Sequence, residues 1–339
     1  MSICLCNLSA DVALELIARK KKEVTPTAVD LTSLTADPEV AKACLGSLVE
    51  ELPKPIELLV GDRGNRCRAG RGVACHVWQG ALPGDGVLAL KENVYVTGPD
   101  LTLLQQATQL HQAQLCQMLG RYLGTWTPSK DSPNGQEERA PLTTFDSLKG
   151  FLRQVKGTKG AQNLALAMAY TCDGAASAPE ASLQLVLSLP PEFYGFGLSQ
   201  PTMNYKVDLS TEAKKLCPKN SIRIDLCWRG SRFGLEYQGK DHGDKLGDDY
   251  ARWFAARKEG YELWFVAKEQ LESAAQMSYI GREVATRIGY DAEKMPWPTK
   301  DELQDLLDIL MGQKNPKPLS RAELRERKKK FKARCRAGA

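Results

Sequence analysis

The sequence predicts an α/β protein, in which an α+β domain precedes a mixed sheet flanked by helices. Several segments place apolar residues three and four positions apart, which is typical of amphipathic helices. Other segments alternate apolar and polar residues, as half-buried strands do. With 42% hydrophobic and 26% charged residues, the 339-residue chain has a globular composition and room for two domains.

Residues 1–126 are expected to form the α+β domain. Its predicted elements are helices at 10–21 and 38–51, followed by strands at 56–60, 72–78 and 87–96. The last strand segment reads as a hairpin that turns at Glu92 and Asn93. Beyond it, Thr97 or Asp100 is expected to cap one helix that continues to Gly124.

Residues 127–143 are rich in proline and charge, which predicts a linker. A second domain is expected at 144–313, with a basic tail at 314–339. Its predicted elements are helices at 144–155, 159–172 and 178–189, strands at 203–209, 221–228 and 233–238, a helix at 247–259, a strand at 262–267, and helices at 268–288 and 299–312. We expect Trp253, Phe254 and Trp264 to lie in its core.

Several protein classes are disfavoured by simple sequence features. No run approaches the roughly 20 apolar residues that a membrane-spanning helix needs, so no membrane partner is expected. The basic residues near the N-terminus follow the apolar ones, which is the wrong order for a secretory signal and favours a cytoplasmic location. None of the ten cysteines forms a CxxC pair, which favours buried, reduced thiols over a structural zinc site.

The net positive charge is concentrated in the C-terminal tail. Of the net charge of +5, the residues from Lys314 onward carry +9, so the rest of the chain carries −4. Clustered basic residues such as Lys328, Lys329 and Lys330 bind nucleic-acid backbones through counterion release, although a tail that aids solubility or associates with RNA has the same composition. The arginine-rich loop that contains Arg66 and Arg68 is a second candidate phosphate contact.

Two neighbouring strands are predicted to carry acidic residues. The strand at 221–228 alternates, with Asp225 and Cys227 on the face away from its isoleucines. The next strand places Glu236 and Gln238 on one face, roughly 6.6 Å apart. If the strands form a hairpin, Asp225 comes near one of these residues. Two converging carboxylates suit a hard divalent cation such as Mg²⁺, which activates water and neutralises phosphate charge.

The order of five segments resembles the PD-(D/E)xK nuclease superfamily, in which an Asp on one strand and an E-x-K on the next form the metal site. The closer resemblance is to restriction-endonuclease-like domains related to very-short-patch repair nucleases, found at the C-terminus of many actinobacterial proteins. It covers about 145–275. The segments are PEASLQLVLSLP, YGFGLSQPTMNYKV, IRIDLCW, GLEYQGKDH and DDYARWFAARKEGYELWFV.

The resemblance implies roles for individual residues. It makes Asp225 and Glu236 ligands of Mg²⁺ or Mn²⁺, and it gives Gln238 the position that a lysine usually holds. A glutamine amide supplies only a dipole where lysine supplies a charge, so Lys240 is a candidate substitute. Glu180 corresponds to a helix glutamate that joins the outer metal shell, although a capping box that begins at Ser177 explains the same residue.

Three further residues are candidate nucleic-acid contacts near this site. His242 is a candidate general base or phosphate contact, and a histidine without a role in a loop is the alternative. Arg252 and Arg257 lie on one predicted helix and are candidate phosphate contacts.

The first half of the chain also resembles a known family. VYVTGPDLTLLQQATQL, at 94–110, is similar to a strand, turn and helix of AbiEi-type antitoxins. The two resemblances together imply a cytoplasmic DNA-binding protein with a divalent-metal-dependent endonuclease domain. The alternative is a non-catalytic transcriptional regulator or antitoxin-like protein that uses the nuclease fold as a scaffold, with a cognate toxin protein as its partner.

Overall fold

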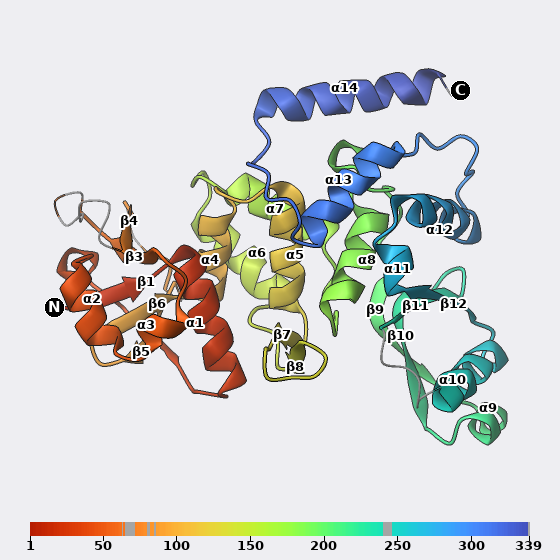
Figure 1. Cartoon of the computed structure of the whole chain (residues 1–339), viewed down its shortest axis with the longest axis horizontal. Helices are drawn as coiled ribbons and strands as arrows, with labels where there is room; N and C mark the ends of the chain where they lie inside the picture. The colour runs from red at the N-terminus through yellow and green to blue at the C-terminus, as the bar shows by residue number, and fades with distance from the viewer. Residues whose placement is uncertain (63, 65–71, 80–81, 85, 240–245, 338–339) are drawn as a thin grey trace. The chain divides into compact units, whose positions relative to one another are not determined.

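The protein is an α/β protein with mixed sheets (Figure 1). The computed structural model describes residues 1–339 except 63, 65–71, 80–81, 85, 240–245 and 338–339. The chain divides into two compact units. Unit 1 contains Met1–Gln109 and Thr127–Leu166, and unit 2 contains Leu110–Trp126 and Ala167–Ala339. This division differs from the predicted domains, because 110–126 belongs to unit 2 and 127–166 to unit 1.

Unit 1 is built on a six-stranded sheet in the order β2-β5-β6-β1-β3-β4. Its strands are β1 (Ile3–Leu5), β2 (Thr25–Pro26), β3 (Ile56–Val60), β4 (Val73–Val77), β5 (Val87–Lys91) and β6 (Val94–Thr97). The pairs β1–β6 and β3–β4 are parallel, and the other pairs are antiparallel. The predicted hairpin at 87–96 is confirmed as β5 and β6, with Asn93 at a φ of 59° in its turn.

Helices and short elements complete unit 1. They are α1 (Asn7–Arg19), the 3-10 turn Leu31–Ser33, α2 (Pro38–Leu45), α3 (Leu48–Glu51), α4 (Pro99–Gln106) and α6 (Phe145–Gln154), and the unit boundary falls within α7 (Ala161–Tyr170). The predicted linker contains most of a two-stranded sheet made by β7 (Trp126–Pro128) and β8 (Gln136–Glu138). Arg139, expected in that linker, is buried and contacts Glu15 of α1 at 2.8 Å.

The single helix expected up to Gly124 is two helices, and this prediction was wrong. After α4 ends, α5 (Gln112–Leu123) starts anew with His111 as its N-cap. The His111 side chain accepts a hydrogen bond from the Ala113 backbone, and Gln114 completes a capping box. A cap of this kind satisfies backbone N–H groups that a continuous helix would have paired internally. The N-cap of α4 is Gly98, and not Thr97 or Asp100.

Unit 2 is built on a four-stranded sheet in the order β12-β11-β10-β9. The strands are β9 (Thr202–Asp208), β10 (Ser221–Trp228), β11 (Phe233–Gln238) and β12 (Glu262–Ala267). The pairs β9–β10 and β10–β11 are antiparallel, and β11–β12 is parallel. The four strands lie within a residue of the positions predicted from the sequence.

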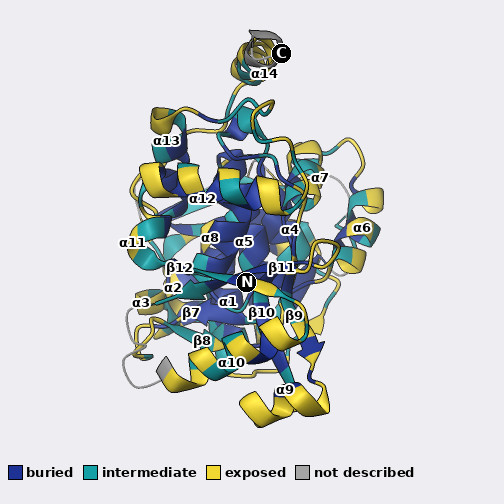
Figure 2. Ribbon diagram, turned by 90° about the vertical axis from the view of Figure 1, so that its right-hand side faces the viewer, coloured by how far each residue is buried: buried dark blue, intermediate teal, exposed yellow. Residues whose placement is uncertain are grey.

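The helices of unit 2 are α5, α8 (Ala178–Ser188), α9 (Thr211–Leu216), α10 (Leu246–Lys258), α11 (Lys268–Leu271), α12 (Ala274–Arg287), α13 (Lys300–Leu310) and α14 (Arg321–Ala337). Residues of α5 and α8 are buried along most of both helices, as Figure 2 shows. The basic tail is the helix α14. The core prediction was wrong for Phe254, whose side chain is 50% exposed, and Trp253 and Trp264 are only partly buried.

The alternation predicted for β10 breaks at Asp225. Cys227 belongs to the same apolar cluster as Ile222 and Ile224, although it was expected on the opposite face. Gly234, which pairs with Cys227, faces the same side, because a Cβ on it would lie 2.5 Å from Ile224. The physical reason is that the Asp225 side chain takes part in the pairing between the strands, where it accepts a hydrogen bond from the Tyr237 backbone.

Candidate functional site

Asp225 lies where the hairpin of β10 and β11 stops pairing through its backbone. The last backbone pair on that side joins Leu226 to Leu235. The next residues of the two strands are Asp225 and Glu236, so they face each other across the hairpin. Asp225 Oδ2 accepts a hydrogen bond of 2.9 Å from the backbone N–H of Tyr237. The carboxylate therefore replaces a backbone carbonyl of β10 as the acceptor and lies between the strands.

Glu236 has a direct cationic partner. Its side chain is only 9% exposed, and Oε2 accepts a 2.8 Å hydrogen bond from the Arg252 guanidinium. Arg252 comes from α10 and also donates to the backbone carbonyl of Arg223. Its other nitrogen lies 3.7 Å from Asp249, one turn earlier on α10. The helix is thus tied to the acidic end of the hairpin by one arginine.

Glu180 brings a third carboxyl group from α8. The predicted N-cap is confirmed, because Ser177 Oγ accepts a hydrogen bond from the Glu180 backbone N–H and donates one to the Glu180 carboxylate. The full capping box is not formed, because the Glu180 side chain does not accept from the Ser177 backbone N–H. Glu180 Oε2 also accepts from the Ala176 backbone at 2.9 Å and from Asn204 Nδ2 at 2.8 Å. Asn204 is on β9 directly across from Asp225, between the backbone pairs on either side. Glu180 is thus held by the start of α8 and contacts β9 beside Asp225, and its role in an outer metal shell stays a prediction.

Burial and mutual repulsion perturb these acids. Burial raises the pKa of Asp225 well above its usual value, and the charges of Glu236 and Glu180 raise it further. Burial likewise raises the pKa of Glu236 to about 7, and the guanidinium of Arg252 opposes this rise. A shared, desolvated group of carboxylates is the arrangement in which a bound cation or a proton relieves repulsion.

The remaining predicted site residues have different surroundings. Gln238 is partly buried, two residues beyond Glu236 on the same strand. Lys240 and His242 lie outside the described residues. Arg252 was predicted as a phosphate contact, and in the structure it is the ion-pair partner of Glu236. Arg257 is exposed, and its guanidinium lies 5.4 Å from the ring centre of Trp253 on the same helix.

The basic segments have only partly described surroundings. Arg66 and Arg68 lie outside the described residues. Lys328 on α14 is 3.5 Å from Glu192, and Lys330 is 2.9 Å from Glu326 one turn earlier. Lys329, between them, is exposed. These contacts leave most of each lysine side chain in solvent, with 51% of Lys328 and 66% of Lys330 exposed.

Sequence reasoning missed Asn204 and the pairing of Arg252 with Glu236. The sequence indicates Asn204 only through its residue type, because asparagine tolerates the φ of 46° found at this position better than most residues do. The ion pair has no local signal, since Arg252 and Glu236 belong to different elements.

Neither a cluster of metal-binding side chains in the described residues nor a known relative identifies the site. Among the described residues, no group of three or more His, Cys, Asp or Glu side chains is arranged to hold a metal ion. In the same part of the chain, no helix has the length and apolar character needed to span a membrane. Comparison of the chain with protein-family models, curated proteins and solved structures finds no match.

Proposed function

We propose that unit 2 binds DNA and cleaves it as a divalent-metal-dependent endonuclease, with its site at Asp225 and Glu236. One observation carries the proposal: the two carboxyl groups face each other at the opened end of the hairpin, where the pKa of each is raised. Such a pair is stabilised when a cation neutralises it. The order of sequence segments resembling the PD-(D/E)xK superfamily supports the same reading.

The donor set fits Mg²⁺ or Mn²⁺. Asp225 and Glu236 would hold the ion, since each uses one oxygen in the contacts above, and no hydrogen bond from a described residue reaches the other oxygen. Two carboxylates are as many protein ligands as Mg²⁺ usually takes. When bound, the ion supplies Lewis-acid polarisation of the phosphate and a water of lowered pKa.

The chain's own residues would then divide the remaining work. The Gln238 amide, together with Lys240, would orient the attacking water, because Gln238 follows Glu236 at the strand period and shares its face. Arg252 would exchange its bond to Glu236 for a phosphate oxygen, as guanidinium groups bind both kinds of oxyanion in the same geometry. Glu180 would keep Asn204, and with it β9, in place beside Asp225.

A cleavage assay with matched variants tests the proposal. Full-length protein with Mg²⁺ or Mn²⁺ is incubated with single-stranded, double-stranded and mismatched DNA. Asp225→Asn and Glu236→Gln should each slow cleavage by about a hundredfold or more. Asp208→Asn and Glu212→Gln, which make the same chemical changes at exposed positions of unit 2, should cleave like the unaltered protein. Intact substrates with the unaltered protein would contradict the proposal.

A non-catalytic regulator or antitoxin-like protein is the second candidate. Two observations favour it: Arg252 already neutralises one oxygen of Glu236, and Gln238 replaces the usual lysine. In this case the nuclease fold is a scaffold, and the partners are DNA and a cognate toxin protein. The double variant Asp225→Ala/Glu236→Ala would then bind DNA as tightly as the unaltered protein, and neither would cleave it. Gel-shift titrations run beside the cleavage assay separate the two functions.

A further inference from the structure

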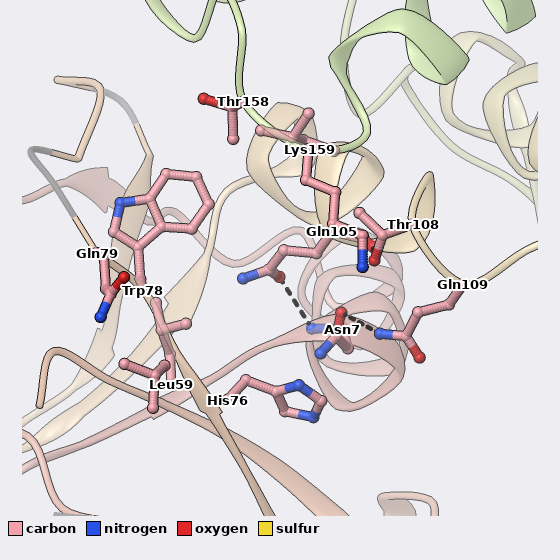
Figure 3. A pocket seen from close by; sticks show the side chains of 12 residues that line it. Asn7, Leu59, His76, Trp78, Gln79, Gln105, Thr108, Gln109, Thr158 and Lys159 are labelled. Carbon is pink, nitrogen blue, oxygen red and sulfur yellow. Dashed lines mark hydrogen bonds between the residues drawn. The ribbon is translucent and has the colours of Figure 1, made fainter. Parts of the chain in front are cut away.

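A pocket of about 270 Å³ opens in unit 1, far in sequence from the acidic residues of unit 2 (Figure 3). It lies near the carboxyl ends of the parallel strands β1 and β6, where ligands of α/β proteins commonly bind. Asn7, at the start of α1, and Gln105, in the last turn of α4, form one wall. Trp78, directly after β4, and the turn at Thr158 and Lys159 form others.

The hydrogen bonds around Gln105 orient its amide group. Gln105 Oε1 accepts from the Asn7 backbone at 3.1 Å and from Thr97 Oγ1 at 3.5 Å. Because the oxygen is engaged, the NH₂ group is the end that remains for the pocket. Figure 3 shows this nitrogen directed away from Asn7, toward the side on which Trp78 lies. Among the described residues, no hydrogen bond uses it, so a ligand acceptor can.

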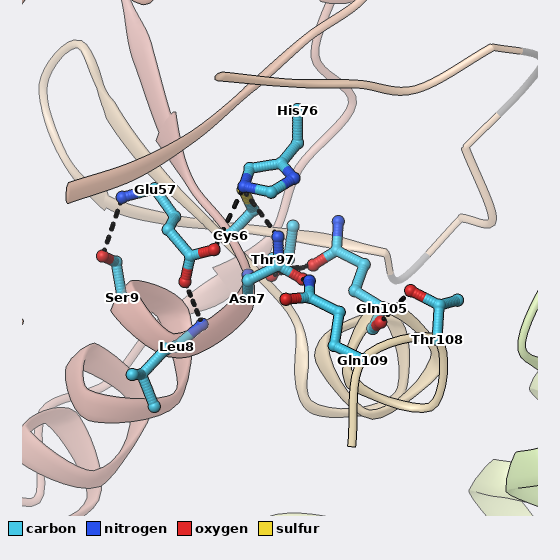
Figure 4. A network of polar contacts seen from close by, with 10 residues as sticks. All are labelled: Cys6, Asn7, Leu8, Ser9, Glu57, His76, Thr97, Gln105, Thr108 and Gln109. Atoms are coloured by element: carbon cyan, nitrogen blue, oxygen red, sulfur yellow. Dashed lines mark hydrogen bonds and ion pairs between the residues drawn. The ribbon is translucent and has the colours of Figure 1, made fainter. Parts of the chain in front are cut away.

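His76 lies beside Glu57 at the same pocket (Figure 4). Its Nε2 lies 3.1 Å from Glu57 Oε1. Glu57 Oε2 accepts a 2.8 Å hydrogen bond from the backbone N–H of Leu8 at the start of α1. This arrangement fixes Nε2 as the nitrogen that faces Glu57. Nδ1 is therefore the ring nitrogen available to a ligand, as an acceptor in neutral histidine or a donor in the protonated form.

Lys159 supplies a positive charge at the rim, on a turn that is packed closely against α4. The next residue, Gly160, has a φ of 94°, and a Cβ on it would lie 2.6 Å from the Leu104 carbonyl. The side chain of Lys159 is exposed, so an anion can reach it. Trp78 adds a planar apolar ring, which stacks favourably on flat heterocycles.

We propose that this pocket binds a single nucleotide. The base would stack on Trp78, an acceptor on its edge would meet the Gln105 NH₂ group, a donor on its edge would meet Nδ1 of neutral His76, and the phosphate would bind Lys159. The volume is just below the range of about 300–1,000 Å³ typical of small-molecule sites, which suits one nucleotide better than a dinucleotide. The pocket belongs to unit 1 and shares no residue with the proposed nuclease site of unit 2, so the nucleotide proposal does not rest on the nuclease proposal.

Titration calorimetry on the full-length chain tests the assignment. The probes are the 5′-monophosphates of adenosine, guanosine, cytidine and uridine, together with the four nucleosides. At least one monophosphate should bind, and Lys159→Met should weaken it about tenfold while leaving its nucleoside unchanged. Lys156→Met removes an exposed lysine of the same turn outside the pocket and should change neither affinity. Trp78→Ala should weaken both ligands.

The nucleotide assignment is overturned if no probe binds at millimolar concentration, or if Lys159→Met and Trp78→Ala leave all affinities unchanged. A short single-stranded oligonucleotide distinguishes the two sources of a nucleotide. Displacement of the bound monophosphate by the oligonucleotide identifies a nucleotide within a strand, and its failure identifies a free nucleotide. Either result supports the pocket chemistry proposed here, and cleavage by unit 2 should be unaffected by Lys159→Met.

Discussion

The carboxyl group of Glu236 links stability to pH at the scale of one residue. Its pKa rises from 4.5 to about 7, mainly through burial. An acid whose pKa is raised in the folded state stabilises the fold at pH values below its unfolded-state pKa of 4.5, and this stabilisation is lost as the pH increases through about 7. We therefore expect Glu236→Gln, which cannot ionise, to be about 2 kcal/mol more stable than the unaltered protein at pH 8.

Urea unfolding at pH 8 and near pH 4 measures this difference. At the lower pH the two proteins should match, because Glu236 is then neutral in both the folded and unfolded chains. Glu212→Gln, at an exposed position of α9, is the matched control and should show no such pH-dependent gain. Equal stability of Glu236→Gln and the unaltered protein at pH 8 would refute the link.

The stability that depends on His111 changes with pH in the opposite direction to that of Glu236. Burial, and then the positive charge of Arg327, lower its pKa from 6.5 to about 4. Above the unfolded-state pKa of 6.5, His111 is neutral in both states and does not change the stability with pH. Below pH 6.5 the unfolded chain takes up a proton before the folded protein does, which stabilises the unfolded state. The folded protein should lose about 2 kcal/mol from this residue between pH 7 and pH 5. His111→Asn keeps a favourable N-cap and removes the titration.

The measurement for His111 is the change in unfolding free energy between pH 7 and pH 5 in the two proteins. His111→Asn should lose about 2 kcal/mol less than the unaltered chain over this interval. An identical loss in both proteins would show that His111 does not control acid stability.

At the scale of elements, the hairpin of β10 and β11 depends on a glycine. A Cβ on Gly234 would lie 2.5 Å from Ile224 Cγ2 and 2.9 Å from Leu263 Cδ2, both in the buried core. Gly234→Ala should therefore destabilise the protein by about 1–3 kcal/mol through overpacking. Gly230→Ala, in the turn of the same hairpin, has open space and should cost far less.

Thermal and urea unfolding of both glycine variants check this prediction. The same variants report on the site, because Gly234 is two residues from Glu236. If Gly234→Ala were as stable as Gly230→Ala, the result would contradict the close packing of β11 against Ile224.

At the scale of the whole molecule, the uneven charge predicts how salt affects DNA binding. The chain from Lys314 onward carries +9, and much of this charge lies on exposed faces of α14. If this helix contacts phosphates, the combined change of Lys328, Lys329 and Lys330 to Gln should reduce the slope of log K against log salt by up to about 3. The same change at Lys20, Lys21 and Lys22 removes equal charge from unit 1 and serves as the control.

Gel-shift titrations at several salt concentrations give both slopes. The α14 variant should lose affinity for unrelated DNA sequences about equally, since phosphate contacts carry no sequence information. Equal slopes for the α14 variant and the unaltered protein would show that this helix does not contact DNA.

Much of unit 2 was predictable from the sequence. The strands β9 to β12 and the start of α8 at its Ser177 cap follow from alternation and capping chemistry, which are local. The shared face of Glu236 and Gln238 follows from the period of a strand. The strands and this shared face depend on residues close together in the chain, so periodicity alone describes them. The sequence left open which of them Asp225 approaches, and the register of the hairpin in the structure places it opposite Glu236.

Tertiary structure decided the rest. β1 has three residues, too few for any period, yet it lies between β6 and β3 in the sheet. The bond from Tyr237 to Asp225 breaks an alternation that the sequence predicts as regular. Arg252 meets Glu236, and Gln105 meets Asn7, because packing joins separate elements. The sequence by itself therefore determined the strands of unit 2 and their acidic face, because these depend on local periodicity, whereas the partners of each polar group depended on how distant segments pack together.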